Sequence, residues 1–245
     1  MTSLSNKLAP YAGALLLLQG LAGCSGENNA ANQTVPEAPA AQTNTASAET
    51  ADTRLVVAFG DSLYAGYGVL PQERFPARLE KALASRGVPA TVRNAGVSGD
   101  TSSAGLRRLA FTLDGLKRKP DLVMVNLGGN DMLRGIDPAE TRANLTAICE
   151  ELKRRGIPIL LTGMVAAPNL GRDYADRFNP IYADLAKRYG AILYPFFLDG
   201  VVTDTQLMLP DRIHPNPKGV DTIVEKIVPM VAEGLDAERG ASAPS

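Results

Sequence analysis

The chain contains a single histidine, His214, which follows Asp211 by three residues. Imidazole is the side chain that most readily moves a proton near neutral pH. A carboxylate beside it can accept a hydrogen bond from the ring and fix its tautomer, as in the general base of acyl-transfer enzymes. A lone histidine is more often an ordinary surface or core residue, so this segment alone leaves both interpretations open.

Ser62 is the candidate nucleophile for such chemistry. It follows the apolar run Leu55–Phe59 and therefore lies in a predicted strand-to-helix turn. At that position its Oγ would be exposed on the rim of a sheet, where the helix dipole favours developing negative charge. His214 would remove the Ser62 proton and later pass it to the leaving group, while Asp211 would orient the ring and stabilise the imidazolium.

The tetrahedral intermediate of acyl transfer needs hydrogen-bond donors for its oxygen. Three groups that follow predicted strands suit this role: the backbone N–H of Ser62, the backbone N–H of Gly99 and the side-chain amide of Asn130. No side chain obstructs approach to Gly99. Tight turns alone also explain Gly99 and the run Gly128–Asp131, so each signal is weak by itself.

Short apolar runs alternate with amphipathic segments from residue 54 onward. Continuous apolar strands separated by helices are typical of α/β proteins, so we predict a three-layer α/β/α sandwich around a mostly parallel sheet of five strands. Ligand sites of such sheets lie outside the carboxyl ends of the strands, where the candidate residues fall. The predicted strands are Leu55–Phe59, Ala90–Arg93, Leu122–Leu127, Ile159–Leu161 and Ala191–Tyr194. The predicted helices are Ser62–Ser85, Ser102–Lys119, Pro138–Arg155, Tyr174–Tyr189 and Pro217–Val231.

Four blocks occur in chain order, each after a predicted strand: Gly60-Asp61-Ser62, Gly99, Gly128-Gly129-Asn130-Asp131 and Asp211–His214. In this order the sequence resembles the SGNH (GDSL) hydrolase superfamily, and most of all its bacterial branch of exported arylesterases, acyl-CoA thioesterases and lysophospholipases. The resemblance covers about residues 54–231 and implies ester hydrolysis through an acyl-enzyme. The chain has no Gly-x-Ser-x-Gly elbow, which argues against an ordinary α/β-hydrolase.

The first 23 residues have the pattern of a signal peptide. Lys7 is their only charge, and the apolar stretch from Tyr11 to Leu18 is too short to span a bilayer, which needs ~20 residues. The run Leu21–Cys24 resembles the lipobox of bacterial lipoproteins, which implies a lipid on Cys24. Ser25 in place of Asp implies, by the same resemblance, attachment to the outer membrane, facing the periplasm. A cytosolic protein in which Cys24 is an incidental thiol is the alternative.

Residues 24–53 are rich in Ala, Thr, Asn, Gln and Pro, so we predict a lipidated Cys24 followed by a disordered tether. The folded domain is predicted over residues 54–235, and residues 236–245 are predicted to be a disordered tail. The 25 basic and 26 acidic residues form no basic stripe, which argues against nucleic acid as a partner. With Cys24 lipidated, Cys149 has no disulfide partner, and we expect a buried thiol.

Two further carboxylates, Asp61 and Asp131, suggest a metal site, but no second imidazole accompanies them, and we expect no metal. We expect Asp61 to accept hydrogen bonds from backbone N–H groups. Asp131 is expected to cap a helix that begins near Ile136 or to stabilise the turn. No phosphate cradle or dinucleotide fingerprint is present, so no cofactor is expected.

The segment Met164–Tyr174 follows the fourth predicted strand and should border the site with apolar side chains. We therefore predict aryl and short-to-medium acyl esters as substrates, with acyl thioesters and lysophospholipids as further candidates. A carbohydrate O-deacetylase is an alternative that the absence of Trp disfavours. A non-catalytic lipid-binding lipoprotein is another, which has no need of a nucleophile, a base and oxyanion donors together. The sequence does not indicate an oligomeric state.

Overall fold

The computed structural model describes residues 53–242, so the predicted signal peptide, Cys24 and nearly all of the predicted tether lie outside the described residues. Five strands form one parallel sheet in the order β2-β1-β3-β4-β5. The strands are β1 Arg54–Gly60, β2 Ala90–Gly96, β3 Leu122–Asn126, β4 Ile159–Thr162 and β5 Ile192–Tyr194. The predicted parallel sheet is confirmed.

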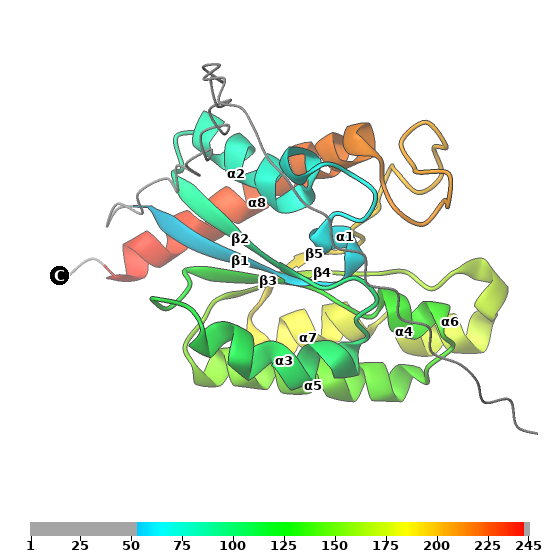
Figure 1. Cartoon of the computed structure of the whole chain (residues 1–245). Helices are drawn as coiled ribbons and strands as arrows, with labels where there is room; N and C mark the ends of the chain where they lie inside the picture. The colour runs from blue at the N-terminus through cyan, green and yellow to red at the C-terminus, as the bar shows by residue number, and fades with distance from the viewer. Residues whose placement is uncertain (1–52, 243–245) are drawn as a thin grey trace, which may run out of the picture. The chain divides into compact units, whose positions relative to one another are not determined.

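Helices cover both faces of this sheet, which gives the three layers that the sequence predicts. Figure 1 shows α2 and α8 on one face and α3, α5 and α7 on the other. The helices are α1 Ser62–Ala65, α2 Phe75–Ser85, α3 Ser102–Asp114, α4 Gly129–Leu133, α5 Pro138–Arg154, α6 Arg172–Phe178, α7 Ile181–Tyr189 and α8 Pro217–Ser242, with short 3₁₀ turns at Pro71–Glu73 and Pro168–Leu170. In the part of the chain that the structure describes, no helix is both long and apolar enough to cross a bilayer.

The central strands are apolar because helices exclude water from both of their faces. Every residue of β3 is buried, and in β1 only Arg54 is partly exposed. Full burial of a Val, Leu, Ile or Phe side chain contributes roughly 1.5–3 kcal/mol. The rigid ends of β1 and β3 are therefore well placed to hold the loops that follow them.

Two helices predicted as continuous are each broken. The predicted helix Ser62–Ser85 divides into α1 and α2 because Gly66 adopts a left-handed conformation, with φ of 79°. A side chain at Gly66 would also collide with Arg74. The predicted helix Tyr174–Tyr189 divides into α6 and α7 at Pro180, because proline lacks the N–H that an uninterrupted helix needs.

The end of the chain also differs from the prediction. Helix α8 continues to Ser242, so the prediction of a disordered tail from residue 236 is wrong for residues 236–242. Ala, Glu and Arg in this stretch are good helix formers, and extending a helix costs far less than starting one. Residues 243–245 lie outside the described part.

Candidate active site

The predicted site residues meet at the carboxyl ends of the parallel strands. Ser62 begins α1 directly after β1, Gly99 lies in the loop after β2, and Asn130 belongs to α4 after β3. Asp211 and His214 lie in the loop between β5 and α8. Ser62, Gly99, Asn130 and His214 line one pocket of about 480 Å³.

The His214 ring joins Ser62 to Asp211. Its Nε2 lies 2.8 Å from Ser62 Oγ, and its Nδ1 lies 2.7 Å from Asp211 Oδ2. Partial burial raises the pKa of Asp211, but hydrogen bonds from the His214 ring and from two backbone N–H groups outweigh it and hold this pKa below its ordinary value. Asp211 is therefore a carboxylate at neutral pH. With Nδ1–H donated to Asp211, Nε2 is free to accept the Ser62 proton.

The loop that carries the histidine is shaped by Asp211 itself. Its Oδ1 accepts hydrogen bonds from the N–H groups of Ile213, at 2.9 Å, and His214, at 3.0 Å. Arg212, which lies between Asp211 and Ile213, has a φ of 56°, a left-handed conformation that costs roughly 1–2 kcal/mol in an L-residue. The N–H of Leu209 donates to the His214 carbonyl at 2.8 Å and closes the loop. One carboxylate therefore both folds the loop and orients the ring.

Buried polar side chains hold the turn that carries Ser62, the candidate nucleophile. Asp61 caps α1 and accepts a hydrogen bond from Leu63 N–H at 3.0 Å, as predicted. Tyr64 Oη lies 3.1 Å from Thr162 Oγ1 on β4, so α1 is tied to the sheet two residues after Ser62. Because Ser62 is the first residue of α1, its N–H has no acceptor within the helix and is available as a donor.

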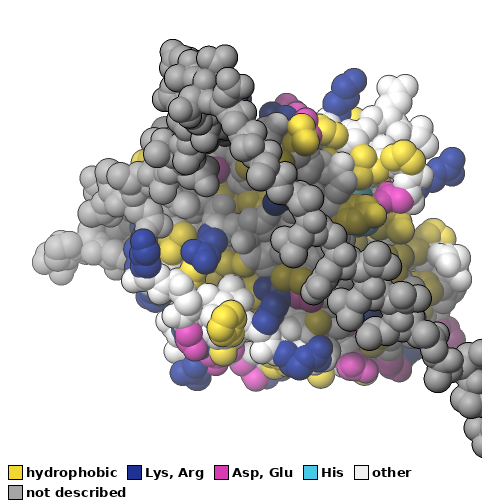
Figure 2. Space-filling view, viewed as in Figure 1, with side chains coloured by type: hydrophobic (Ala, Val, Ile, Leu, Met, Phe, Trp, Pro, Cys, Tyr) yellow, Lys and Arg dark blue, Asp and Glu magenta, His cyan; other side chains and the backbone are white. Residues whose placement is uncertain are grey.

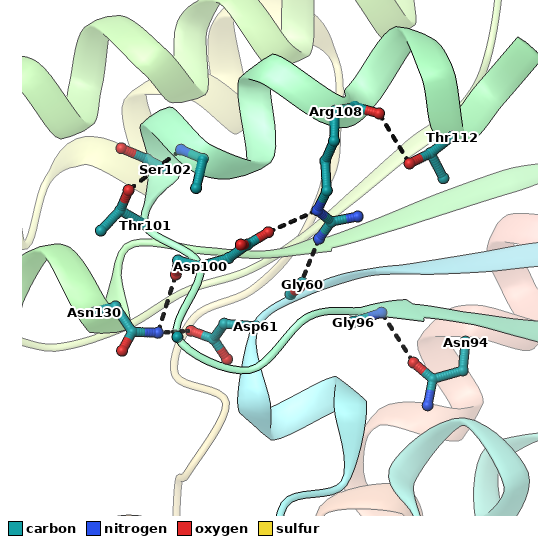
Figure 3. A network of polar contacts seen from close by, with 12 residues as sticks. Gly60, Asp61, Asn94, Gly96, Asp100, Thr101, Ser102, Arg108, Thr112 and Asn130 are labelled. Atoms are coloured by element: carbon teal, nitrogen blue, oxygen red, sulfur yellow. Dashed lines mark hydrogen bonds and ion pairs between the residues drawn. The ribbon is translucent and has the colours of Figure 1, made fainter. Parts of the chain in front are cut away.

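Asp61 is almost completely buried, and this burial raises its pKa to about 7. Hydrogen bonds from Leu63 N–H and the Asn130 amide oppose the rise, while the nearby charges of Asp100 and Asp131 add to it. Burial therefore brings the pKa of Asp61 close to neutrality. The bond from Asn130 joins this carboxyl group to one of the predicted oxyanion donors (Figure 3).

Asn130 is more tightly held than its predicted role requires. Its Nδ2 donates to Asp61 Oδ2 at 3.2 Å and to the Asp100 carbonyl at 3.0 Å. An amide nitrogen has two hydrogens, so a substrate oxygen must share or replace one of these bonds. The role of Asn130, Gly99 and the Ser62 N–H as oxyanion donors stays a prediction.

Asp131 does not cap a helix near Ile136. It is fully buried and accepts hydrogen bonds from Ser102 N–H at 2.7 Å, from Ser102 Oγ, and from Thr141 Oγ1 at 3.1 Å. It therefore ties the start of α3 to α5, a contact between segments about thirty residues apart that no local pattern reveals. Within residues 53–242 no group of three or more His, Cys, Asp or Glu side chains could hold a metal ion.

The wall of the pocket is largely apolar. Figure 2 shows several hydrophobic side chains exposed on one face of the molecule. Met164 and Ala167 come from the segment that the sequence predicts to border the site, while Tyr174 at its end turns away and donates to the Ile136 carbonyl at 3.0 Å. The apolar lining residues are Leu63, Met132, Leu133, Met164, Ala167, Leu198, Val202 and Ile213.

Sequence reasoning missed three contributors to the site. The Tyr67 ring lies 4.5 Å from the His214 ring and lines the pocket. Leu198 and Val202 reach it from the loop after β5. The apolar side chain of Val202 was a usable signal in the sequence, but Val202 belongs to none of the four blocks, so the sequence did not place it at the site. Cys149 is a buried thiol as expected, and burial raises its pKa to about 12.

Residues 58–221 match the GDSL-like Lipase/Acylhydrolase family. The chain belongs to this family. It is 37% identical over 188 residues to an arylesterase of Vibrio mimicus, with 77% of this chain and 92% of the relative covered. It is 39% identical over 188 residues to thioesterase 1/protease 1/lysophospholipase L1 of Escherichia coli, with 75% and 87% covered. The crystal structure of AlinE4, an SGNH-hydrolase family esterase, shares 52% identity and superposes with a TM-score of 0.65 over 76% of this chain and 98% of that one. The protein is a serine ester hydrolase.

Proposed function

We propose that this protein hydrolyses aryl and short-to-medium acyl esters through an acyl-enzyme on Ser62. The observation that carries the proposal is the hydrogen-bonded series Ser62–His214–Asp211 at the mouth of an apolar pocket. Ser62 Oγ attacks the ester carbonyl carbon while His214 Nε2 takes its proton. The resulting imidazolium faces the Asp211 carboxylate, which stabilises its charge.

The remaining steps use the same groups. The carbonyl oxygen of the tetrahedral intermediate accepts hydrogen bonds from the Ser62 and Gly99 N–H groups and from Asn130, and each such donor contributes ~2.7–4 kcal/mol to transition-state stabilisation. The intermediate expels the alcohol, which receives the proton from His214. Water then attacks the acyl-enzyme, His214 again serves as base, and the carboxylic acid leaves as Ser62 is regenerated.

The pocket supports an aliphatic acyl group. Its volume of about 480 Å³ is in the range of ordinary small-molecule sites. Met132 and Met164 in its wall are flexible thioethers that adapt to chains of different length. A relative named thioesterase and lysophospholipase supports acyl thioesters and lysophospholipids as further substrates. Among residues 53–242, Tyr67 is the only Phe, Tyr or Trp side chain that lines the pocket, which offers little for stacking a sugar.

The experiment is hydrolysis of p-nitrophenyl esters of graded acyl length by the full chain. Ser62→Ala and His214→Ala should each lower kcat by about 10³-fold or more. Ser103→Ala is the control, because Ser103 lies on α3 outside the pocket and should leave the rate unchanged. Full activity of Ser62→Ala would contradict the proposal. A folded but inactive wild type would direct attention to sugar acetates.

We further propose that the mature protein begins at Cys24, carries a lipid there, and is anchored to the outer membrane facing the periplasm. Support comes from the lipobox-like run Leu21–Cys24, which lies outside the described residues. Fatty-acid labelling tests it: Cys24→Ser should lose the label and the membrane association, whereas Cys149→Ser should keep both. Equal labelling of wild type and Cys24→Ser would refute the anchor.

A further inference from the structure

Arg108 lies on α3 and reaches from the helix to the ends of two strands (Figure 3). Its Nε donates to Asp100 Oδ2 at 2.6 Å, and its Nη2 donates to the Gly60 carbonyl at 2.9 Å. The guanidinium carbon sits 4.1 Å from the centre of the Phe59 ring. The Arg108 side chain therefore contacts Phe59 and Gly60, which lie just before the Ser62 turn. It also contacts Asp100, which follows Gly99.

The Gly60 carbonyl is a shared anchor for the loop that carries Gly99. Val97 N–H donates to this carbonyl at 2.9 Å, and Asp100 N–H donates back to the Val97 carbonyl at 3.2 Å. Gly99, at the third position of this turn, has a φ of 86°, which favours glycine. The start of the loop, at Val97, therefore binds the Gly60 carbonyl directly. The end of the loop, at Asp100, is connected to the same carbonyl through Arg108.

Asp100 also connects this loop to Asn130. Its side chain binds Arg108, and its carbonyl accepts the Asn130 amide at 3.0 Å. Two of the predicted oxyanion donors, the Gly99 N–H and the Asn130 Nδ2, are thus positioned through Asp100. On the exposed side, Arg134 Nη2 donates to the Gly99 carbonyl at 2.8 Å, but it does not reach the nucleophile turn.

The geometry suits arginine and no other side chain. A guanidinium offers donors in two fixed directions within one plane, whereas a lysine ammonium is a single point that cannot hold both acceptors at these positions. The ring of Phe59 fixes that plane by a cation–π contact. The Arg108 and Asp100 side chains are only 21% and 12% exposed, so water screens their pairing little.

We infer that Arg108 is a positioning residue for ester hydrolysis: through Asp100 and the Gly60 carbonyl it holds the Gly99 loop and Asn130 at the correct distance from Ser62. The inference rests on the proposed acyl-enzyme at Ser62. It predicts an effect on the transition state rather than on substrate affinity, because the oxyanion forms only after binding.

The test measures kcat and KM of the full chain for a p-nitrophenyl ester. The concentration of active sites is determined by titration with a phosphonate that labels the active serine, and kcat is expressed per active site. Arg108→Gln should lower kcat by roughly 30–100-fold, because the oxyanion donors are misplaced but not removed, and it should change KM by less than about threefold. Arg108→Lys should recover part of the loss. Arg107→Gln is the matched control, because Arg107 is exposed and bonds only Ser103 Oγ, at 2.8 Å.

Asp100→Asn provides an independent variant, since it keeps the carbonyl that binds Asn130 and weakens the bond to Arg108. It also removes the Asp100 charge, which helps to raise the pKa of Asp61, so wild type and variant are compared at the same pH. Asp100→Asn should reproduce the loss of kcat, and the double variant Arg108→Gln/Asp100→Asn should lose no more than the worse single variant. A lower Tm for Arg108→Gln with wild-type kcat per titrated site would show a purely structural role and overturn the inference. So would a rise in KM alone. Inactivity of the wild type would instead defeat the proposed function.

Discussion

Replacing Asp61 by asparagine should make the protein more tolerant of rising pH. The folded state raises the pKa of Asp61 from 3.8 to about 7, chiefly because the side chain is buried. Between these two values the folded protein keeps a proton that the unfolded chain has lost. The free energy of unfolding therefore falls as pH rises through this window, and Asp61 lowers stability at neutral pH.

The size of the effect follows from the width of the window. A difference of about three pKa units corresponds to roughly 4 kcal/mol in total, at 1.36 kcal/mol per unit. Between pH 5 and pH 8 the wild type should lose roughly 2.5 kcal/mol relative to Asp61→Asn. The variant also loses one of the two hydrogen bonds that Asp61 accepts, since its amide nitrogen donates where an oxygen accepted, at a nearly constant cost of about 1 kcal/mol.

Urea unfolding of wild type and variant at intervals from pH 5 to pH 8 measures this difference. Asp137→Asn is the control. Hydrogen bonds from Ala139 N–H and Arg177 lower the pKa of Asp137, so its contribution is complete above 3.8 and is lost only as pH falls further. Its curve should therefore run parallel to the wild type across the range. Parallel curves for Asp61→Asn as well would show that Asp61 is ionised at pH 5 in the folded state and refute the reasoning.

Three further outcomes are expected. Asp211→Asn should lower kcat by about 10⁴-fold in steady-state assays because the ring loses its orienting acceptor, and a loss below tenfold would contradict the role of Asp211. Val202→Phe should shift the best p-nitrophenyl ester to a shorter acyl chain by filling the pocket, and an unchanged length profile would place the acyl group elsewhere. Cys149 should resist iodoacetamide in the native protein and react after unfolding, because burial raises its pKa to about 12; rapid native labelling would contradict the burial.

The parallel sheet could be predicted from the sequence because its strands are continuous apolar runs. Leu122–Asn126 is buried throughout, and nothing in its pattern competes with a strand. Helix interruptions were harder to foresee. Gly66 ends α1 in a left-handed conformation, but a glycine inside a helical pattern does not always end the helix, so its residue type alone did not decide the break.

Some features of the site could likewise be predicted from the sequence, and others could not. Ser62 and His214 could be placed on one rim because each belongs to a block after a strand, and parallel strands bring their carboxyl ends together. The hydrogen-bond partners of Asp131 and of Arg108 could not be predicted from the sequence. The Asp131–Ser102 bond spans 29 positions and the Arg108–Gly60 bond spans 48, and neither pairing has a periodicity that a single sequence displays.

Asp61 shows why such hidden contacts matter for function. A buried carboxyl group with a raised pKa lowers stability at neutral pH, so packing alone gives no reason to retain it. What it contributes is position: one oxygen binds Leu63 N–H and fixes the start of the nucleophile helix, and the other binds the Asn130 amide. Ser62 and the predicted oxyanion donor Asn130 are thereby connected through a single side chain. Strained or destabilising groups cluster where function requires a fixed geometry, and the position of Asp61 between these two residues agrees with that rule.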